Sequence, residues 1–305
     1  MDKIYSIFNV SQFFSSGISM IIDGYLMFLI LCKTPEDAKN FALNLMFNSI
    51  ASLLNNILIA FILFRTTIHS KSIHTVFLGS CNYLGVEFCI TSWSLIQMCK
   101  FLFLYSTVIS FMIRYASFVH IEITKCKTIF TLGIVFVVSS LVGIAHRLQL
   151  ETGLSKETDT AQSELFFADG SQRVFVAIYY GQAVPCYILV IVLRFLVIRE
   201  LNALTPFMSE TTLRTHKQFI KVMTIQLIYP LLRCLSLISV YMAVEFPEVP
   251  RMTHTILSYV IMVGNIIFPL TSIVFFRAYR EYTIQLVQRA KKAILRKRTA
   301  TVTTS

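Results

Sequence analysis

The chain has 305 residues and a formal net charge of +11, yet only 14% of its residues are charged and 55% are hydrophobic. Soluble domains carry about 25% charged residues, so the composition excludes a soluble globular protein. The 26 phenylalanines and the single tryptophan fit helices that face lipid.

Seven apolar segments occupy most of the chain. A helix rises about 1.5 Å per residue, so roughly 20 residues cross a hydrocarbon core. Lipid offers the backbone no hydrogen-bond partners, so such segments must be helical. The predicted spans are residues 13–32, 40–64, 87–113, 128–145, 174–198, 219–243 and 254–276, of which the fourth is two residues short of that length. The sequence predicts an all-α bundle of seven transmembrane helices, in a single domain over residues 1–305.

Lysine and arginine are unevenly divided between the two sides of these spans. Of the 27 basic residues, 17 fall on one side, in the loops, in the tail and, for Lys221, at the end of the sixth span; 7 fall on the other side, and three lie deeper within spans. Basic residues near membrane ends stay in the cytoplasm. We therefore expect the tail, residues 277–305, inside and the N-terminus outside. The positive charge then reflects membrane topology, and we expect no nucleic-acid partner.

The N-terminal arm has no cluster of basic residues, and no small-residue cleavage site follows the first apolar run. That run is therefore expected to be a retained span and not a signal peptide. The arm contains Asn9-Val10-Ser11, a glycosylation sequon on the side predicted to be extracellular. Asn9 is thus a candidate glycosylation site, close to the start of the first span.

The seven cysteines give little sign of a disulfide framework. Only Cys81, before the third span, falls clearly on the extracellular side. Cys89 follows eight residues later, about 12 Å away if the stretch is helical, which is too far for a disulfide. The outer loop over residues 146–173 has no cysteine. We expect no disulfide without a rearrangement, and most thiols should be packing residues.

Two helix starts are predicted on the inner side. Ser209, with Glu210 in the following turn, reads as the start of the sixth helix. Beyond the seventh span, apolar residues recur at spacings of three and four, and basic residues occupy the other face: Tyr279, Tyr282, Leu286, Ala290 and Ala293, against Arg280, Arg289, Lys291, Lys292 and Arg296. This pattern predicts a short amphipathic helix on the inner leaflet, with anionic membrane lipids as partners.

Charged residues deep in the membrane cost roughly 2.5–3.5 kcal/mol each on insertion scales, so each needs a reason. Asp23 lies near the middle of the first span, Lys100 near the middle of the third, and Arg233 in the outer half of the sixth. Even if Asp23 pairs with one cation, the other needs water, a carbonyl or an anionic ligand group. Arg233 is the preferred pocket cation, and a structural role beside Asp23 or backbone carbonyls is the alternative.

Polar residues and prolines gather in the third, fifth, sixth and seventh spans. Pro185, Pro230 and Pro269 each remove a backbone hydrogen bond and allow a bend. Helix packing accounts for most of these residues individually, but their clustering indicates a ligand pocket. The candidate pocket residues are Arg233, Lys100, Gln97, Gln226, Tyr229, Tyr180 and Asn265.

An enzyme or a pump fits the sequence poorly. The six histidines lie in loops or at span ends, with no pair at helical metal-ligand spacing. The spans hold no carboxylate pair, and the seventh has no lysine, which excludes a retinal Schiff base. We expect no catalytic residue, no metal and no cofactor.

Short motifs resemble those of one receptor family. Arg114-Tyr115 ends the third span without the preceding Asp of the rhodopsin-like Asp-Arg-Tyr, and the seventh span lacks Asn-Pro-x-x-Tyr. Lys33-Thr34-Pro35, Gly79-Ser80-Cys81 and Tyr279-Arg280 resemble the nematode serpentine chemoreceptors of class delta. That family usually has Gly-Pro-Cys where this chain has Gly79-Ser80-Cys81, and the neighbouring class r is the alternative.

The resemblance implies a G-protein-coupled receptor fold and a chemosensory receptor that binds a small odorant or soluble cue. Its implied partners are a small-molecule ligand and a heterotrimeric G protein, with Arg114 and Tyr115 as the inner switch that faces the G protein. The implied location is the plasma membrane, in the cilium of a sensory neuron.

The runner-up function is a seven-span ligand-gated channel or transporter, and an intramembrane enzyme comes third. Insect odorant receptors are channels with seven spans, but they are longer and keep the N-terminus inside, contrary to the distribution of basic residues. Ionic current in cells that lack G proteins would distinguish a channel from a receptor.

Overall fold

The computed structural model describes the backbone of residues 2–34, 39–69, 72–119, 124–153, 164–167, 169–210 and 251–302, together with scattered residues of a sixth segment between 213 and 235. Side chains are described at residues 10–34, 42–63, 77–119, 124–148, 181–210 and 263–293 and at those same scattered positions. All structural statements below concern these parts of the chain.

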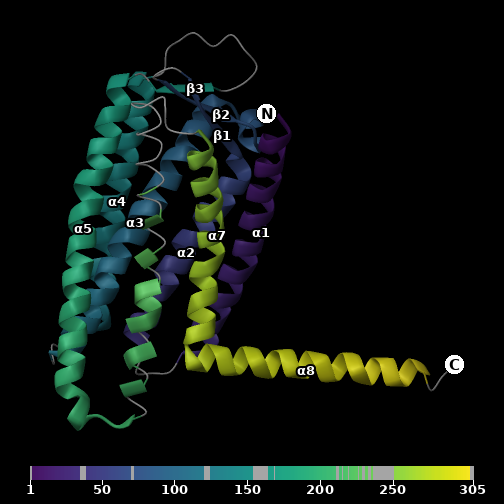
Figure 1. Cartoon of the computed structure of the whole chain (residues 1–305), viewed down its shortest axis with the longest axis vertical. Coiled ribbons are helices and arrows are strands. Elements are labelled where there is room, and N and C mark those ends of the chain that lie inside the picture. Colours follow the sequence, from purple (N-terminus) through teal and green to yellow (C-terminus); the bar gives the residue numbers. More distant parts are fainter. Residues whose placement is uncertain are drawn as a thin grey trace.

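Long helices run side by side along one axis of the molecule (Figure 1). They are α1 (Asp2–Lys33), α2 (Lys39–Ile62), α3 (Val86–Phe118), α4 (Lys125–Gly153), α5 (Asp169–Leu204) and α7 (Arg251–Phe275). A further helix, α8 (Arg277–Val302), leaves the end of α7 crosswise to the bundle. The described residues of the sixth segment, between Glu210 and Leu235, are helical as well. The helical fold expected from the sequence is therefore confirmed.

Five helical stretches in the described chain are long and apolar enough to cross a membrane: Val10–Lys33, Ala42–Ile62, Val86–Phe118, Lys125–Leu148 and Gly181–Phe207. The described side chains of α7 add a shorter apolar stretch, Val263–Phe275. Helix α4, which contains the shortest predicted span, is 29 residues long. The sixth predicted span, residues 219–243, lies largely outside the described residues.

Helix α3 forms the centre of the bundle. It contacts α2, α4 and α5, and most of its residues between Cys89 and Phe111 are buried. The ring of Phe103 lies 4.4 Å from that of Phe268, which joins α3 to α7. By contrast, α4 and α5 expose large apolar side chains such as Phe130 and Phe195. The buried position of α3 fits a helix that is apolar on all sides. The exposed apolar side chains of α4 and α5 fit contact with lipid.

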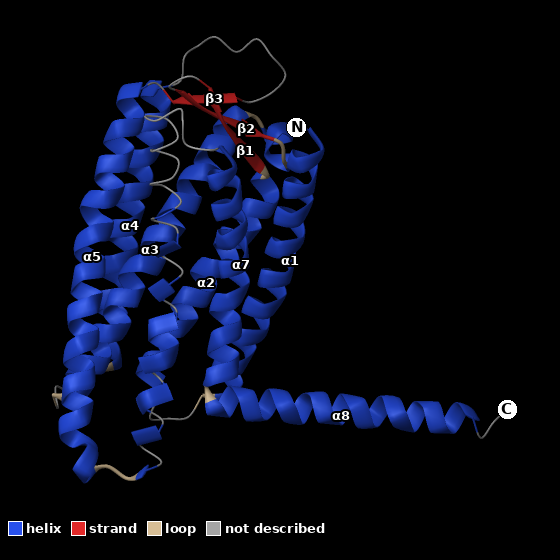
Figure 2. Cartoon of the chain, viewed as in Figure 1, coloured by secondary structure: helices blue, strands red, loops and turns tan. Residues whose placement is uncertain are grey.

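A small antiparallel sheet closes the end of the bundle that is predicted to be extracellular (Figure 2). Its strands are β1 (Phe64–His69), β2 (Ser72–Phe77) and β3 (Glu164–Phe167), in that order across the sheet. Phe64 pairs with Phe77, and Ile73 pairs with Phe167. The sequence analysis predicted no strand here. The short runs are rich in Thr, Ile, Val and Phe, which favour strands. The predicted second span ends at Phe64, the first residue of β1, and the residues after it are expected to form a loop.

The expectation that Cys81 and Cys89 cannot form a disulfide is wrong. The two residues are bonded, with their Cα atoms 5.3 Å apart. The stretch between them is not one continuous helix. A 3₁₀ helix, η2 (Ser80–Leu84), ends at Gly85, whose φ of 98° suits glycine alone among the common residues, and α3 starts directly afterwards. This break brings the two sulfur atoms together.

Gly79 makes the close approach between η2 and the end of α2 possible. A Cβ atom on Gly79 would lie 2.5 Å from the carbonyl carbon and oxygen of Ile62, and closer still to the backbone oxygen of Phe61. The amide of Gly79 also donates to the oxygen of Ile62 at 2.8 Å. The backbone atoms cannot yield as a flexible side chain would.

We predict that Gly79→Ala destabilises the protein, because the added methyl group collides with backbone. The expected cost is about 1–3 kcal/mol, measured as a lower midpoint of thermal unfolding of the purified protein. Gly133→Ala is the matched control, since a Cβ at Gly133 would meet nothing within 4 Å. Equal unfolding midpoints for Gly79→Ala and the unchanged protein would contradict the close approach.

Candidate functional site

Lys100 and Gln97, two of the predicted pocket residues, lie together on α3. The Lys100 Nζ donates a hydrogen bond to Gln97 Oε1 at 2.9 Å and lies 5.4 Å from the centre of the Trp93 ring. Residues spaced by three and four share one face of a helix, so the three side chains form a stripe. A cation near an aromatic face is stabilised by the ring.

Of the other predicted pocket residues, only Asn265 has a described side chain. Asn265 belongs to a different polar cluster, described below. Tyr180 lies within α5, but its side chain is outside the described residues, as are Arg233, Gln226 and Tyr229. The pocket shared by all seven therefore stays a prediction. The sequence analysis missed Tyr105, whose hydroxyl donates to Gln182 Oε1 of α5 at 2.6 Å.

Asp23 lies in a buried polar cluster between α1 and α2. Its Oδ2 atom accepts hydrogen bonds from Ser52 Oγ at 2.9 Å and Asn56 Nδ2 at 3.2 Å, and Ser19 Oγ lies 3.5 Å from it. No described lysine or arginine pairs with it, so hydroxyl and amide groups take the place of the cation that the sequence analysis considered. The signal was available as two pairs at helical spacing of four: Ser19 with Asp23, and Ser52 with Asn56.

Helix α7 joins this cluster through a carbonyl group. Pro269, within α7, has no backbone N–H, so the carbonyl of Asn265 four residues earlier has no intrahelical donor. The hydroxyl of Ser19 donates to that oxygen at 2.9 Å. A bend-permitting proline in α7 is thus compensated by a side chain of α1.

Arg114 and Phe118, one helical turn apart on α3, lie opposite the sixth segment, at the end of the bundle that is predicted to face the cytoplasm and is called the inner end below. The guanidinium carbon of Arg114 lies 5.8 Å from the centre of the Phe118 ring. The centre of the Phe118 ring also lies 4.9 Å from the centre of the His216 ring in the sixth segment. Tyr115 packs against the apolar cluster that contains Phe118 and Ile220. Both predicted switch residues therefore lie at the junction of α3 with the sixth segment.

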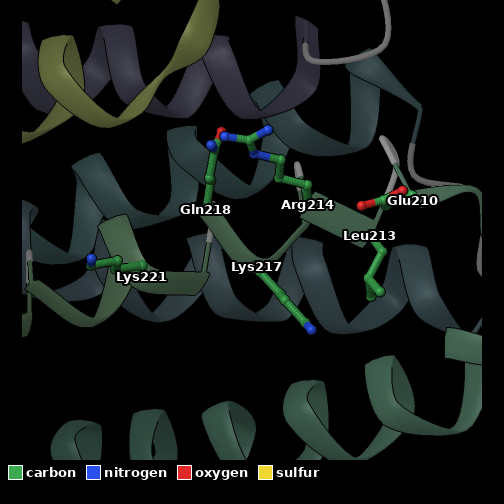
Figure 3. A pocket seen from close by; sticks show the side chains of 6 residues that line it. All are labelled: Glu210, Leu213, Arg214, Lys217, Gln218 and Lys221. Atoms are coloured by element: carbon green, nitrogen blue, oxygen red, sulfur yellow. The ribbon is translucent and has the colours of Figure 1, made fainter.

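A cavity of about 530 Å³ opens at this same end of the molecule. Figure 3 shows its lining side chains, all from the sixth segment: Glu210, Leu213, Arg214, Lys217, Gln218 and Lys221. Three of them are basic and one is acidic. The Lys221 Nζ also lies 4.9 Å from the ring of Phe275 at the end of α7. The cavity is electropositive and is distinct from the predicted pocket in the outer half. The predicted start of the sixth helix is confirmed beside it, since Leu213 N donates to Ser209 O at 2.9 Å.

The start of α8 is held against the inner end of α1. Thr34 Oγ1 donates to the oxygen of Ile30 at 2.7 Å, so the hydroxyl of Tyr279, 2.7 Å away, is the donor to Thr34. Tyr279 is only 2% exposed. The Lys33 Nζ lies 4.4 Å from the ring centre of Tyr282. Two of the motifs singled out in the sequence, Lys33-Thr34-Pro35 and Tyr279-Arg280, thus meet in space.

We predict that Tyr279→Phe loosens α8 from α1, because it removes one buried hydrogen bond worth about 1 kcal/mol. Faster amide hydrogen exchange in the first turns of α8 and a lower unfolding midpoint should report the change. Tyr282→Phe is the matched control, since its ring contacts with Lys33 and Phe28 do not need the hydroxyl. Equal exchange rates in the two variants would contradict this role.

We also predict an acid-sensitive contribution from His216, which precedes the sixth predicted span. Burial, and then the positive charge of Arg114, lowers the pKa of His216 from 6.5 to about 4. Between these values the unfolded chain binds a proton that the folded protein does not, so stability falls as the pH drops from 6.5 towards 4. His216→Gln should flatten the pH dependence of the unfolding midpoint over this window, whereas Lys217→Gln should not. Superimposable profiles for the wild-type protein and His216→Gln would refute the prediction.

Comparisons with known proteins find related sequences and a similar fold. The chain is 25% identical over 307 residues to "Serpentine receptor class delta-3" of Caenorhabditis elegans, covering 91% of this chain and 87% of that one. It is 24% identical over 238 residues to "Serpentine receptor class delta-19" of the same organism, covering 72% and 70%. Its fold is similar to the crystal structure of squid rhodopsin, with a TM-score of 0.67, 10% sequence identity and coverage of 95% and 87%.

The fold similarity confirms the predicted seven-helix bundle. The chain is a multi-pass membrane protein of a receptor family and not an enzyme, and the predicted resemblance to class delta is confirmed. The family model described as "Serpentine type 7TM GPCR chemoreceptor Srd" matches residues 8–285. The chain therefore belongs to the Srd family of serpentine chemoreceptors.

Proposed function

We propose that the protein is a chemosensory G-protein-coupled receptor, which binds a small odorant or soluble cue and activates a heterotrimeric G protein. The observation that carries this proposal is the contact of Arg114, Phe118 and His216 at the inner end of α3, beside an electropositive cavity. Family membership supplies the receptor class. The plasma membrane of a sensory-neuron cilium is the proposed location.

The contact between α3 and the sixth segment suits a switch. The Phe118 ring of α3 contacts the ring of His216 in the sixth segment. The guanidinium of Arg114, also on α3, lies near the same Phe118 ring. A ligand that binds one bundle arrangement better shifts the population towards it. If that arrangement separates the sixth segment from α3, Arg114 and Tyr115 become accessible to a cytoplasmic partner, and the partner in turn favours the ligand-bound form.

The polar stripe of α3 supports a ligand site in the outer half of the bundle. Lys100 and Gln97 are joined by a hydrogen bond beside Trp93, which offers a cation, an amide and an aromatic face together. We propose that this stripe, with Tyr180, Gln226, Tyr229, Arg233 and Asn265, contacts the ligand, and that an anionic or strongly polar group suits it. Helix α8, with its basic face, is proposed to rest on anionic lipids of the inner leaflet.

The proposal is tested by Arg114→Ala in cells that express the receptor with a promiscuous G protein and are screened with small molecules. Loss of the cation and of its contact with Phe118 should reduce ligand-stimulated G-protein activation by roughly two- to thirtyfold, since a cation–π contact is worth about 0.5–2 kcal/mol. Surface expression should be unchanged. Arg199→Ala is the matched control, because Arg199 is an exposed cation of α5 near the same end and pairs with Glu200.

Two results would contradict the proposal. Normal G-protein activation by Arg114→Ala would remove the switch from this junction. A ligand-dependent ionic current in cells without G proteins would favour a channel over a receptor.

A further inference from the structure

The corner around η2, which leads into α3 at the end predicted to be extracellular, exposes several large apolar side chains. They are Leu78 at 41% exposed, Tyr83 at 93%, Leu84 at 60%, Val86 at 37% and Phe88 at 43%. The inner side of the corner is apolar as well, since Cys81 and Cys89 are both 0% exposed. Soluble proteins rarely gather exposed apolar groups in this way, and such patches mark contacts with other proteins or with membranes.

Hydrogen bonds hold this corner at the level where the apolar helices end. The amide of Gly79 donates to Ile62 O at 2.8 Å. The amide of Leu78 donates to Leu63 O at the same distance. Ile62 ends the apolar stretch of α2, and Val86 begins that of α3, so η2 lies at the boundary of the hydrocarbon core. The headgroup region beyond that boundary is about 5–7 Å deep on each side.

The exposed corner is continuous with apolar surface in the membrane-spanning part of α2. This helix exposes Ile50, Leu54 and Ile57, which follow one another at spacings of four and three and so form one stripe. Phe61 continues the stripe after four more residues, and the centre of its ring lies 5.5 Å from that of the Phe88 ring. Surface that faces lipid along α2 therefore leads directly to the corner.

The corner has a fixed shape and carries little charge. The disulfide described above closes it, and Asn82 Nδ2 donates to Phe77 O at 2.5 Å. A group that is already held in one shape loses less conformational freedom on binding. Glu87 is the only charged residue between positions 78 and 88, and it pairs with Arg147 at 3.1 Å.

We propose that residues 78–88 form an anchor in the headgroup layer of the outer leaflet, with the side chains of Tyr83 and Leu84 inserted between lipids. Tyrosine is enriched at this depth, because its ring is apolar and its hydroxyl reaches water. The anchor has no lysine or arginine, so it binds neutral phosphatidylcholine as well as anionic lipid. Because η2 leads directly into α3, the anchor fixes the depth of Gln97 and Lys100 in the membrane.

The test places a fluorescent reporter at the most exposed position of the corner. Tyr83→Trp with Trp93→Phe leaves one tryptophan, because the chain has a single one. The purified full-length protein is reconstituted as single copies in phosphatidylcholine nanodiscs, with or without bromine on the acyl chains. The reporter should lose most of its emission in brominated lipid and little of it to iodide in the water. Added anionic lipid or salt should change neither result.

The wild-type protein is the matched control. Its native Trp93 packs inside the corner, with the centre of its ring 6.4 Å from that of the Phe77 ring, so brominated lipid should quench it much less than the reporter. If Trp93→Phe does not fold, Tyr83→Trp with Trp93 retained gives the same answer as a difference from the wild-type protein.

Three results would overturn the proposal. Quenching of the reporter by iodide and not by brominated lipid would place the corner in water. Protection from both quenchers would mean that a protein surface covers the corner. Quenching by brominated lipid only when anionic lipid is present would mean that charge, and not apolar insertion, holds the corner at the membrane.

Discussion

The hydrocarbon core of a bilayer offers no hydrogen bonds, so polar groups inside the bundle must satisfy one another. This constraint explains why the buried side chains of the first two helices are so often Ser and Asn. The hydroxyl of Ser19 serves a backbone oxygen that Pro269 leaves without a donor. Asn44 similarly ties α2 to Ser106 and Ser110 of α3. Polar pairs of this kind fix which helix faces lie together, whereas apolar packing alone would tolerate sliding.

Three short motifs that identify the family by sequence have physical reasons in the fold. Gly79 allows the chain to pass close to the backbone of α2, and Cys81 then bonds to Cys89. At the opposite end, Thr34 bonds to Tyr279, which holds the start of α8. The motifs therefore form two connections between helices. One joins α2 to α3, and the other, at the opposite end of the bundle, joins α1 to α8. They hold the long helices together at both ends of the bundle.

The sequence predicted the helices well, because length and hydropathy alone decide whether a segment can cross a bilayer. It predicted that Arg114 and Tyr115 lie at the inner end of α3, and it placed Asp23 deep in the membrane. It could not find the partners of Asp23, since Ser52 and Asn56 lie on another helix and contact depends on helix rotation. It failed at Cys81 and Cys89 because a helix was assumed across Gly85, where a single residue with positive φ breaks it. The strands were missed because they are only four to six residues long and their pairing joins segments that are far apart in the sequence.

Helix α8 gives the protein an asymmetric footprint on the side that is predicted to be cytoplasmic. Its 26 residues span about 39 Å at the usual rise per residue, which exceeds the thickness of the hydrocarbon core itself. The helix points away from the bundle in one direction only (Figure 1). Neighbouring membrane proteins can therefore approach closely on the side of α4 and α5. On the opposite side, α8 prevents a close approach. Crowded receptors of this shape would pack with a preferred orientation.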